Sequence, residues 1–119
     1  MVLDVKNALN LAVEALRRGD ISGSQAAIRT VIAERPGHPD CYNLSGLNLV
    51  ALNDYVYALY EFMLAIRFKS DVPEYYCNAA MCNIRLGRMD DAKDVLQKGL
   101  SAAGENALCR DMLARLGQE

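Results

Sequence analysis

The stretch that decides the fold is residues 73–100, which read PEYYCNAAMCNIRLGRMDDAKDVLQKGL. Small and apolar residues recur at helical spacing up to Leu86, and Gly87 and Arg88 then interrupt the pattern. A second amphipathic pattern begins near Met89, so the stretch predicts two helices joined by a tight turn. One such hairpin cannot bury its own apolar face, and it therefore needs neighbours of the same kind.

The rest of the chain supplies two further copies of this hairpin. The turn dipeptides begin at Gly19, Asn53 and Gly87, each 34 residues after the last. Shifting the chain by this period also aligns small residues with small ones and large apolar residues with large ones. The aligned positions after the turns are Ser24, Ala58 and Ala92, then Ile28, Phe62 and Leu96, and those in the leading helices are Ala12, Gly46 and Ala80.

This combination of period, turn residues and small–large alternation resembles the tetratricopeptide repeat family. The resemblance covers three repeats, at about residues 5–38, 39–72 and 73–106, within a single domain over residues 1–119. It implies an all-α fold, an α-solenoid of three helix hairpins followed by a C-terminal capping helix. We expect helices near residues 3–18, 22–35, 39–52, 55–68, 73–86, 89–102 and 105–116. In the capping helix, Leu108, Met112 and Leu116 form the expected apolar face.

Charge and hydropathy exclude several classes of function. The 13 Lys and Arg residues against 15 Asp and Glu give a net charge of −2, so the chain has no basic field for nucleic acid. No apolar run approaches the roughly 18 residues of a membrane span. Asp4 and Lys6 interrupt any signal-peptide core near the N-terminus. We therefore expect a cytoplasmic protein that neither binds nucleic acid nor inserts into a membrane.

The four cysteines, Cys41, Cys77, Cys82 and Cys109, favour reduced thiols that pack as small apolar residues. Cys77 and Cys82 are five residues apart, which is not a common ligand spacing, and His38 has no partner at such a spacing. No phosphate loop or catalytic constellation appears in the sequence. We expect no catalytic, cofactor-binding or metal-binding residues; the alternative is a small enzyme or redox protein that uses Cys77 and Cys82.

The resemblance implies a concave wall built from the first helix of each repeat. Its inward-facing positions are mainly apolar, and we take nine of them as the candidate binding groove: Leu9, Val13, Leu16, Asn43, Leu47, Val50, Cys77, Met81 and Ile84. The remaining inward positions form a rim of mostly charged residues: Lys6, Arg17, Asp40, Ala51, Glu74 and Arg85. An apolar trough suits an amphipathic helix or an extended apolar segment of a partner protein. The alternative is that some of these side chains simply pack under neighbouring helices.

Family members that hold the acidic C-terminal tails of heat-shock proteins use a clamp of lysine, asparagine and arginine. At the clamp positions of the first repeat this chain has Leu9 and Val13. At those of the third repeat it has Glu74 and Asn78. The clamp is absent from this sequence, so the resemblance implies a less charged ligand.

A second apolar surface is predicted on the helix at residues 55–68, YVYALYEFMLAIRF. Repeat packing accounts for only part of its apolar side chains, and the positions left over are Val56, Tyr57, Tyr60, Met63 and Leu64. The equivalent positions of the third repeat are polar: Asp90, Asp91, Asp94, Gln97 and Lys98. An exposed apolar patch of this composition indicates an interface, for a co-chaperone or a second copy of the chain. The alternative is that these side chains lie flat over neighbours and expose little.

These features predict a non-catalytic protein-binding module or chaperone. Three repeats with a cap, an apolar groove and a second apolar face resemble the small repeat chaperones of bacterial type III secretion. That resemblance implies a client whose aggregation-prone amphipathic segment is kept soluble before export, and in some cases a second small chaperone on the outer surface. The alternative is a homo-oligomerising adaptor without chaperone activity.

Overall fold

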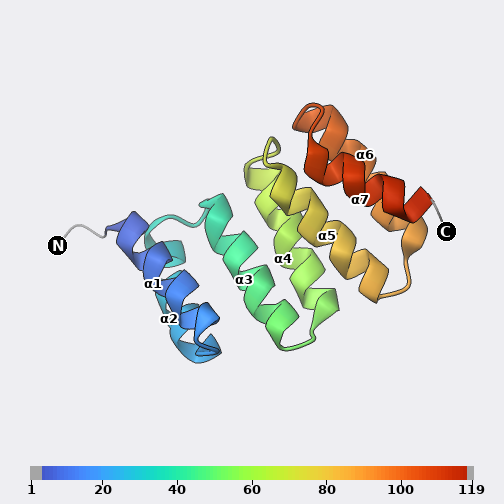
Figure 1. Cartoon of the computed structure of the whole chain (residues 1–119). Coiled ribbons are helices and arrows are strands. Elements are labelled where there is room, and N and C mark those ends of the chain that lie inside the picture. Colours follow the sequence, from blue (N-terminus) through green and yellow to red (C-terminus); the bar gives the residue numbers. More distant parts are fainter. Residues whose placement is uncertain (1–3, 118–119) are drawn as a thin grey trace.

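The computed structural model describes residues 4–117, which form seven α-helices stacked as successive hairpins (Figure 1). The helices are α1 (Val5–Arg17), α2 (Ile21–Glu34), α3 (Pro39–Ala51), α4 (Tyr55–Phe68), α5 (Pro73–Arg85), α6 (Met89–Ala102) and α7 (Ala107–Gly117). Each predicted helix is present, with ends within two residues of those expected. The predicted all-α solenoid is therefore confirmed.

The turns inside the three hairpins share one backbone conformation. Gly19, Asn53 and Gly87 have φ angles of 79°, 60° and 76°, in the left-handed region that favours glycine and tolerates asparagine. In the first two turns Asp20 and Asp54 follow, and each side chain accepts a hydrogen bond from an amide of the next helix, at 2.9 and 3.3 Å. The turn residues identified in the sequence thus end one helix and start the next.

Two helices begin two residues later than the sequence predicts. The side chain of Asp4 accepts a hydrogen bond from an amide of the first turn, so α1 begins at Val5. The predicted start at residue 3 lies outside the described residues. In the same way Asn106 Oδ1 accepts a hydrogen bond from the Cys109 amide at 2.8 Å, so α7 begins at Ala107 rather than at residue 105.

The apolar face of the capping helix α7 differs from the predicted one. Leu108 was expected to cover the last hairpin, but its side chain is 49% exposed. The face that packs against α5 and α6 instead consists of Cys109, Met112, Leu113 and Leu116, at i, i+3, i+4 and i+7. Two of the three predicted residues, Met112 and Leu116, therefore belong to the buried face, whereas Cys109 and Leu113 take the place of Leu108.

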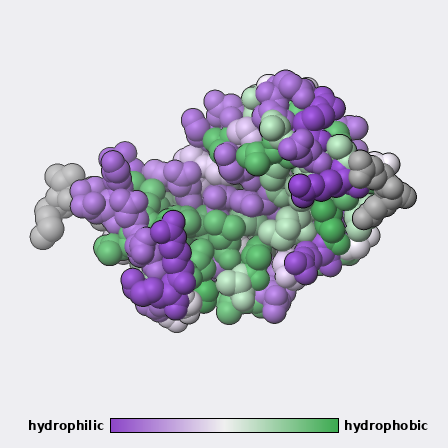
Figure 2. All heavy atoms as spheres, viewed as in Figure 1, coloured by the Kyte–Doolittle hydropathy of each residue, from purple (hydrophilic) through white to green (hydrophobic). Residues whose placement is uncertain are grey.

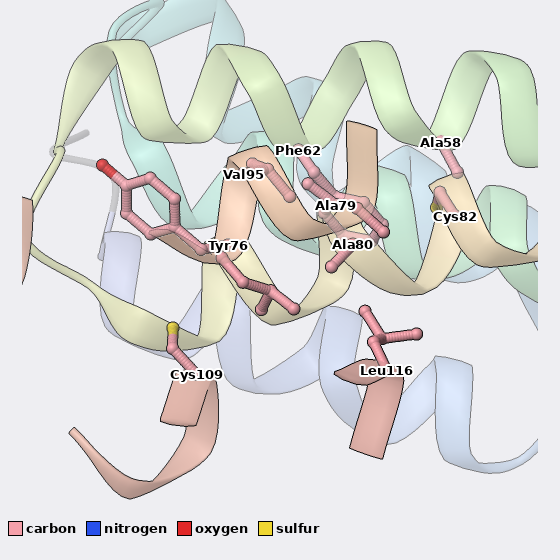
Figure 3. Packing of buried hydrophobic residues seen from close by; sticks show 11 residues of the cluster. Ala58, Phe62, Tyr76, Ala79, Ala80, Cys82, Val95, Cys109 and Leu116 are labelled. Carbon is pink, nitrogen blue, oxygen red and sulfur yellow. The ribbon is translucent and has the colours of Figure 1, made fainter. Parts of the chain in front are cut away.

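The core is divided into two clusters along the stack. The larger joins α4, α5, α6 and α7; Figure 3 shows Phe62 and Val95 converging around Ala79 and Ala80 of α5. The smaller joins α1, α2 and α3, and its buried members are Ala12, Ile28, Val31, Cys41 and Leu44. Partly buried Leu47 packs against both clusters. Each hairpin thus completes its core only by contact with the next.

The small residues of the repeat pattern allow close helix contacts. A Cβ atom added to Gly46 of α3 would come within 2.5 Å of the Phe62 ring on α4. A Cβ atom added to Gly99 of α6 would come within 2.8 Å of Cys109 Sγ and 2.9 Å of Tyr76. Glycine at these two positions is therefore a packing requirement.

A buried polar contact lies where the first hairpin meets the second. Asn48 Nδ2 of α3 donates a hydrogen bond of 3.0 Å to Ser24 Oγ of α2, and both side chains are fully buried. Asn48 Oδ1 has no hydrogen-bond partner among the described residues. A buried acceptor without a partner costs free energy, so this junction is less favourable than a purely apolar one.

No helix within residues 4–117 combines the length and the apolar character needed to cross a membrane.

Candidate protein-binding groove

The nine candidate groove residues lie on α1, α3 and α5, the first helices of the three hairpins, and all nine are partly exposed. In Figure 2, which has the same view as Figure 1, apolar atoms gather in the middle of the face and hydrophilic residues flank them. Side chains that are partly exposed can pack against the core and still contact a ligand.

A pocket of 610 Å³ lies between α1 and α3. Its apolar lining is formed by Val5, Leu9, Val13 and Leu44. Its polar lining is formed by Lys6, Asn10, His38, Asp40 and Asn43. The lining thus combines apolar side chains with polar groups, as is usual for a binding site.

The pocket gathers three of the nine candidates, Leu9, Val13 and Asn43. The other six lie outside its lining. Five of them are partly buried against the larger core cluster: Leu47, Val50, Cys77, Met81 and Ile84. Leu16, near the C-terminal end of α1, is half-buried. The five side chains at the larger cluster thus contact the core and still keep part of their surface exposed.

Four pocket residues were missed by sequence reasoning: Val5, Asn10, His38 and Leu44. Helical periodicity assigns residues to faces of single helices, whereas this pocket depends on the space left between two hairpins. His38 precedes α3, and its Nδ1 atom is buried without a hydrogen-bond partner among the described residues. The one available signal was its position between Pro36 and Pro39 at the entrance to a helix.

Polar contacts hold α3 against α5 beside the pocket. Asn78 Nδ2 donates a hydrogen bond of 2.9 Å to Asn43 Oδ1, and the Tyr75 hydroxyl donates one of 2.5 Å to Asp40 Oδ1. Burial, and then the hydrogen bond to Asp40, raise the pKa of Tyr75, so its hydroxyl stays protonated and continues to donate. No such side-chain hydrogen bond joins α1 to α3 in the described part of the chain, and the pocket lies at that unbridged junction.

The second predicted surface lies on the outer face of α4. Tyr57 and Tyr60 are 65% and 62% exposed, and Val56 and Met63 are also exposed, while Leu64 is half-buried. The first four of these line a shallow pocket of 530 Å³ together with Leu59 and Glu61. The opposite face of the helix is fully buried at Ala58, Phe62 and Ala65. The two tyrosine rings therefore do not lie flat against neighbouring helices.

The matching face of α6 is different. Its five equivalent residues are all exposed and polar: Asp90, Asp91, Asp94, Gln97 and Lys98. The two helices occupy the same place in their hairpins, so the apolar character of α4 is not imposed by the fold.

The thiol neighbour of Cys77 is Cys109, and not the Cys82 of the enzyme or redox alternative. Cys77 Sγ lies 3.8 Å from Cys109 Sγ on α7, whereas Cys82 is fully buried. Burial raises the pKa of Cys82 to about 11. Among residues 4–117, no three or more His, Cys, Asp or Glu side chains gather in a way that could hold a metal ion.

The tetratricopeptide-repeat fold is defined by stacked antiparallel helix hairpins. Small residues lie at the close contacts between helices, each turn contains a residue with a positive φ angle, and the first helices form a concave face. This chain adopts that fold. No protein family profile matches the sequence, and no curated protein sequence matches it.

Solved structures agree with this assignment. The first repeat domain of Spaghetti (RPAP3), bound to the HSP90 peptide SRMEEVD, has a TM-score of 0.81 at 16% identity, with 98% of this chain and 97% of that chain covered. The Sgt2 repeat domain from Aspergillus fumigatus has a TM-score of 0.84 at 13% identity, covering 98% and 79%. The Yersinia enterocolitica type III secretion chaperone SycD, in complex with a peptide of the translocator YopD, has a TM-score of 0.80 at 13% identity, covering 96% and 87%.

Proposed function

We propose that this protein is a non-catalytic binding module or chaperone that holds an amphipathic or apolar segment of a partner protein in its concave groove. The observation that carries the proposal is the apolar pocket between α1 and α3, to which Leu9 and Val13 both contribute. Concave surfaces of stacked repeats are the usual binding sites of solenoid proteins. Peptide complexes of similar folds, RPAP3 with an HSP90 peptide and SycD with a YopD peptide, support the same general role.

The chemistry of the groove favours an apolar ligand over an acidic tail. Leu9 and Val13 line the pocket, and both stand at positions where the heat-shock clamp carries polar side chains. Asn78, at a third clamp position, already donates its hydrogen bond to Asn43. A carboxylate brought to this wall would lose its hydration, and the pocket lining would offer it a single cation, Lys6, together with the acidic Asp40. An apolar helix stripe would instead be stabilised by burial of its surface.

The more specific form of the proposal is a type III secretion chaperone, with the exposed apolar face of α4 as a second interface. The fold similarity to SycD supports the first part. The exposure of Tyr57 and Tyr60 supports the second. In this form the groove covers the apolar stripe of the client, and the outer face contacts a small co-chaperone.

A double substitution in the groove tests this function. We expect Val13→Glu with Met81→Glu to weaken client binding by about a hundredfold or more, because two carboxylates would meet the client's apolar stripe. The client is first captured from the source organism and identified by mass spectrometry. Its affinity for the purified protein is then measured by calorimetry, and circular dichroism checks that the helical signal is kept.

The matched control places two glutamates on the outer helices, Ala26→Glu with Gln97→Glu, where both side chains are exposed. The control should bind the client as the parent protein does. Unchanged affinity in the groove variant would show that the groove is assigned to the wrong surface.

The second candidate function is a homo-oligomerising adaptor without chaperone activity. The exposed apolar face of α4, with its 530 Å³ pocket, is the observation that favours it. In that case the face would bury itself against a second copy of the chain, and the protein would not be monomeric in solution.

A further inference from the structure

The two thiols that lie closest together belong to different helices. Cys77 is on α5 and Cys109 is on α7, and their sulfur atoms are 3.8 Å apart. A disulfide requires about 2.05 Å, so the two sulfurs would have to approach by just under 2 Å for the bond to form. The pairing is a product of the fold, since 32 positions separate the two residues along the chain.

The surroundings of the two sulfurs differ. Cys109 is fully buried beneath Gly99 and Tyr76, and its sulfur also lies 3.9 Å from the Pro73 carbonyl oxygen. Cys77 is only half-buried and belongs to the concave wall. A reagent in solution therefore reaches Cys77 first, while Cys109 is held next to it and protected.

The other two cysteines lack this arrangement. Cys41 and Cys82 are both fully buried, and each has a thiol pKa raised to about 11, mainly by burial. Neither forms a sulfur–sulfur contact in the described part of the chain. They are internal controls for any thiol chemistry at the pair.

We propose that Cys77 and Cys109 form a redox modification site, at which a low-molecular-weight disulfide such as oxidised glutathione converts the two thiols into a disulfide that links α5 to α7. The Cys77 thiolate attacks one glutathione sulfur, forms a mixed disulfide and releases one glutathione thiolate. The Cys109 thiolate then attacks the Cys77 sulfur and releases the second glutathione thiolate. The protein loses two electrons and two protons, and one glutathione disulfide becomes two glutathione thiols.

Deprotonation of Cys77 controls the first step. Burial, and next the neighbouring Cys109, raise the pKa of Cys77 to about 12, and the carboxylate of Glu74 adds to the shift. The thiolate is consequently scarce near neutral pH, so the first step is slow there and becomes faster as the pH rises. Once the mixed disulfide forms, the second step is intramolecular, because Cys109 is already in contact.

The disulfide would connect the capping helix α7 covalently to α5. It would close a loop across α6 and so reduce the conformational freedom of the unfolded chain. We expect the midpoint of thermal unfolding to rise by roughly 5–10 °C on oxidation.

The test uses the purified full-length protein with oxidised glutathione at pH 8.5, followed by alkylation of the remaining thiols and peptide mapping. We expect a mass loss of two hydrogen atoms, a peptide linking residues 77 and 109, and the rise in unfolding temperature. Cys82→Ala should behave in the same way. Cys109→Ala should stop at the glutathione adduct of Cys77, and Cys77→Ser, changed at the half-buried position, should form neither product.

Circular dichroism establishes that each variant is folded before oxidation. A glutathione adduct that persists on Cys77 of the folded parent protein would overturn the proposal. So would a link that joins Cys77 to any other cysteine, or a link that forms only after the protein is denatured.

Discussion

At the scale of single residues, the fold depends on a few helical glycines at which any side chain would overlap a neighbouring helix. Gly46 is the clearest, because the Phe62 ring lies where its Cβ would be. Phe62 is itself fully buried and belongs to the larger core cluster, so the ring cannot move into solvent. Small and large residues at these positions are therefore matched across α3 and α4.

We predict that Gly46→Ala destabilises the protein by about 1–3 kcal/mol, because overpacking outweighs the helix propensity that alanine gains. The free energy of unfolding is measured by urea denaturation followed by circular dichroism. Gly117→Ala is the matched control, since a Cβ atom there meets nothing within 4 Å. A Gly46→Ala variant as stable as the control would refute the close contact.

The close contact at Gly46 was predictable from the sequence, whereas one residue of the buried α7 face and the pocket beside His38 were not. The small residue at position 46 recurs at the repeat period, so it was visible as a pattern. On α7, Met112 and Leu116 were assigned correctly to the buried face, but Leu108 was chosen in place of Cys109, because both complete an apolar stripe and only contact with α5 and α6 decides between them. The pocket beside His38 was not predictable, because it depends on how far apart two hairpins lie.

At the scale of the helix, α4 and α6 are equivalent elements with opposite outer faces. Both bury a face made of small and large apolar residues. The outward face of α4 carries Val56, Tyr57, Tyr60 and Met63, and that of α6 carries acidic and amide residues together with lysine. This difference was readable from the sequence, because α6 supplied a comparison within the same chain.

We predict that Tyr57→Ser with Tyr60→Ser raises the solubility of the free protein, or weakens its self-association by about tenfold or more if it is oligomeric. Static light scattering over a range of concentrations measures both. The control, Gln97→Ser with Lys98→Ser on α6, should leave the association state as it was. Identical behaviour of the two variants would argue against an interface on α4.

At the scale of the whole molecule, the division of the core determines how stability is distributed. The larger cluster joins α4 to α7, and the smaller joins α1 to α3. The junction between the first two hairpins contains the buried Asn48–Ser24 hydrogen bond and an acceptor without a partner. Repeat proteins unfold from their less stable ends, since each repeat contacts only its neighbours.

We therefore predict that α1 and α2 open before the rest of the chain. Native-state hydrogen exchange should give opening free energies about 1–3 kcal/mol lower for the slowest amides of α1 and α2 than for those of α5 and α6. Uniform protection along the whole stack would contradict this. The proposed pocket lies at the same junction, so client binding should raise the protection of α1.

The elongated shape of the solenoid limits the length of a client segment that it can cover. Its longest dimension is 51 Å, against 27 and 19 Å in the other two directions. An α-helix rises about 1.5 Å per residue, so a helical client lying along the stack can extend over roughly 34 residues before it passes both ends. On the proposed function, a longer amphipathic segment would leave part of its apolar stripe uncovered. The length of the stack would then set an upper limit on the segment that one copy of this protein can shield.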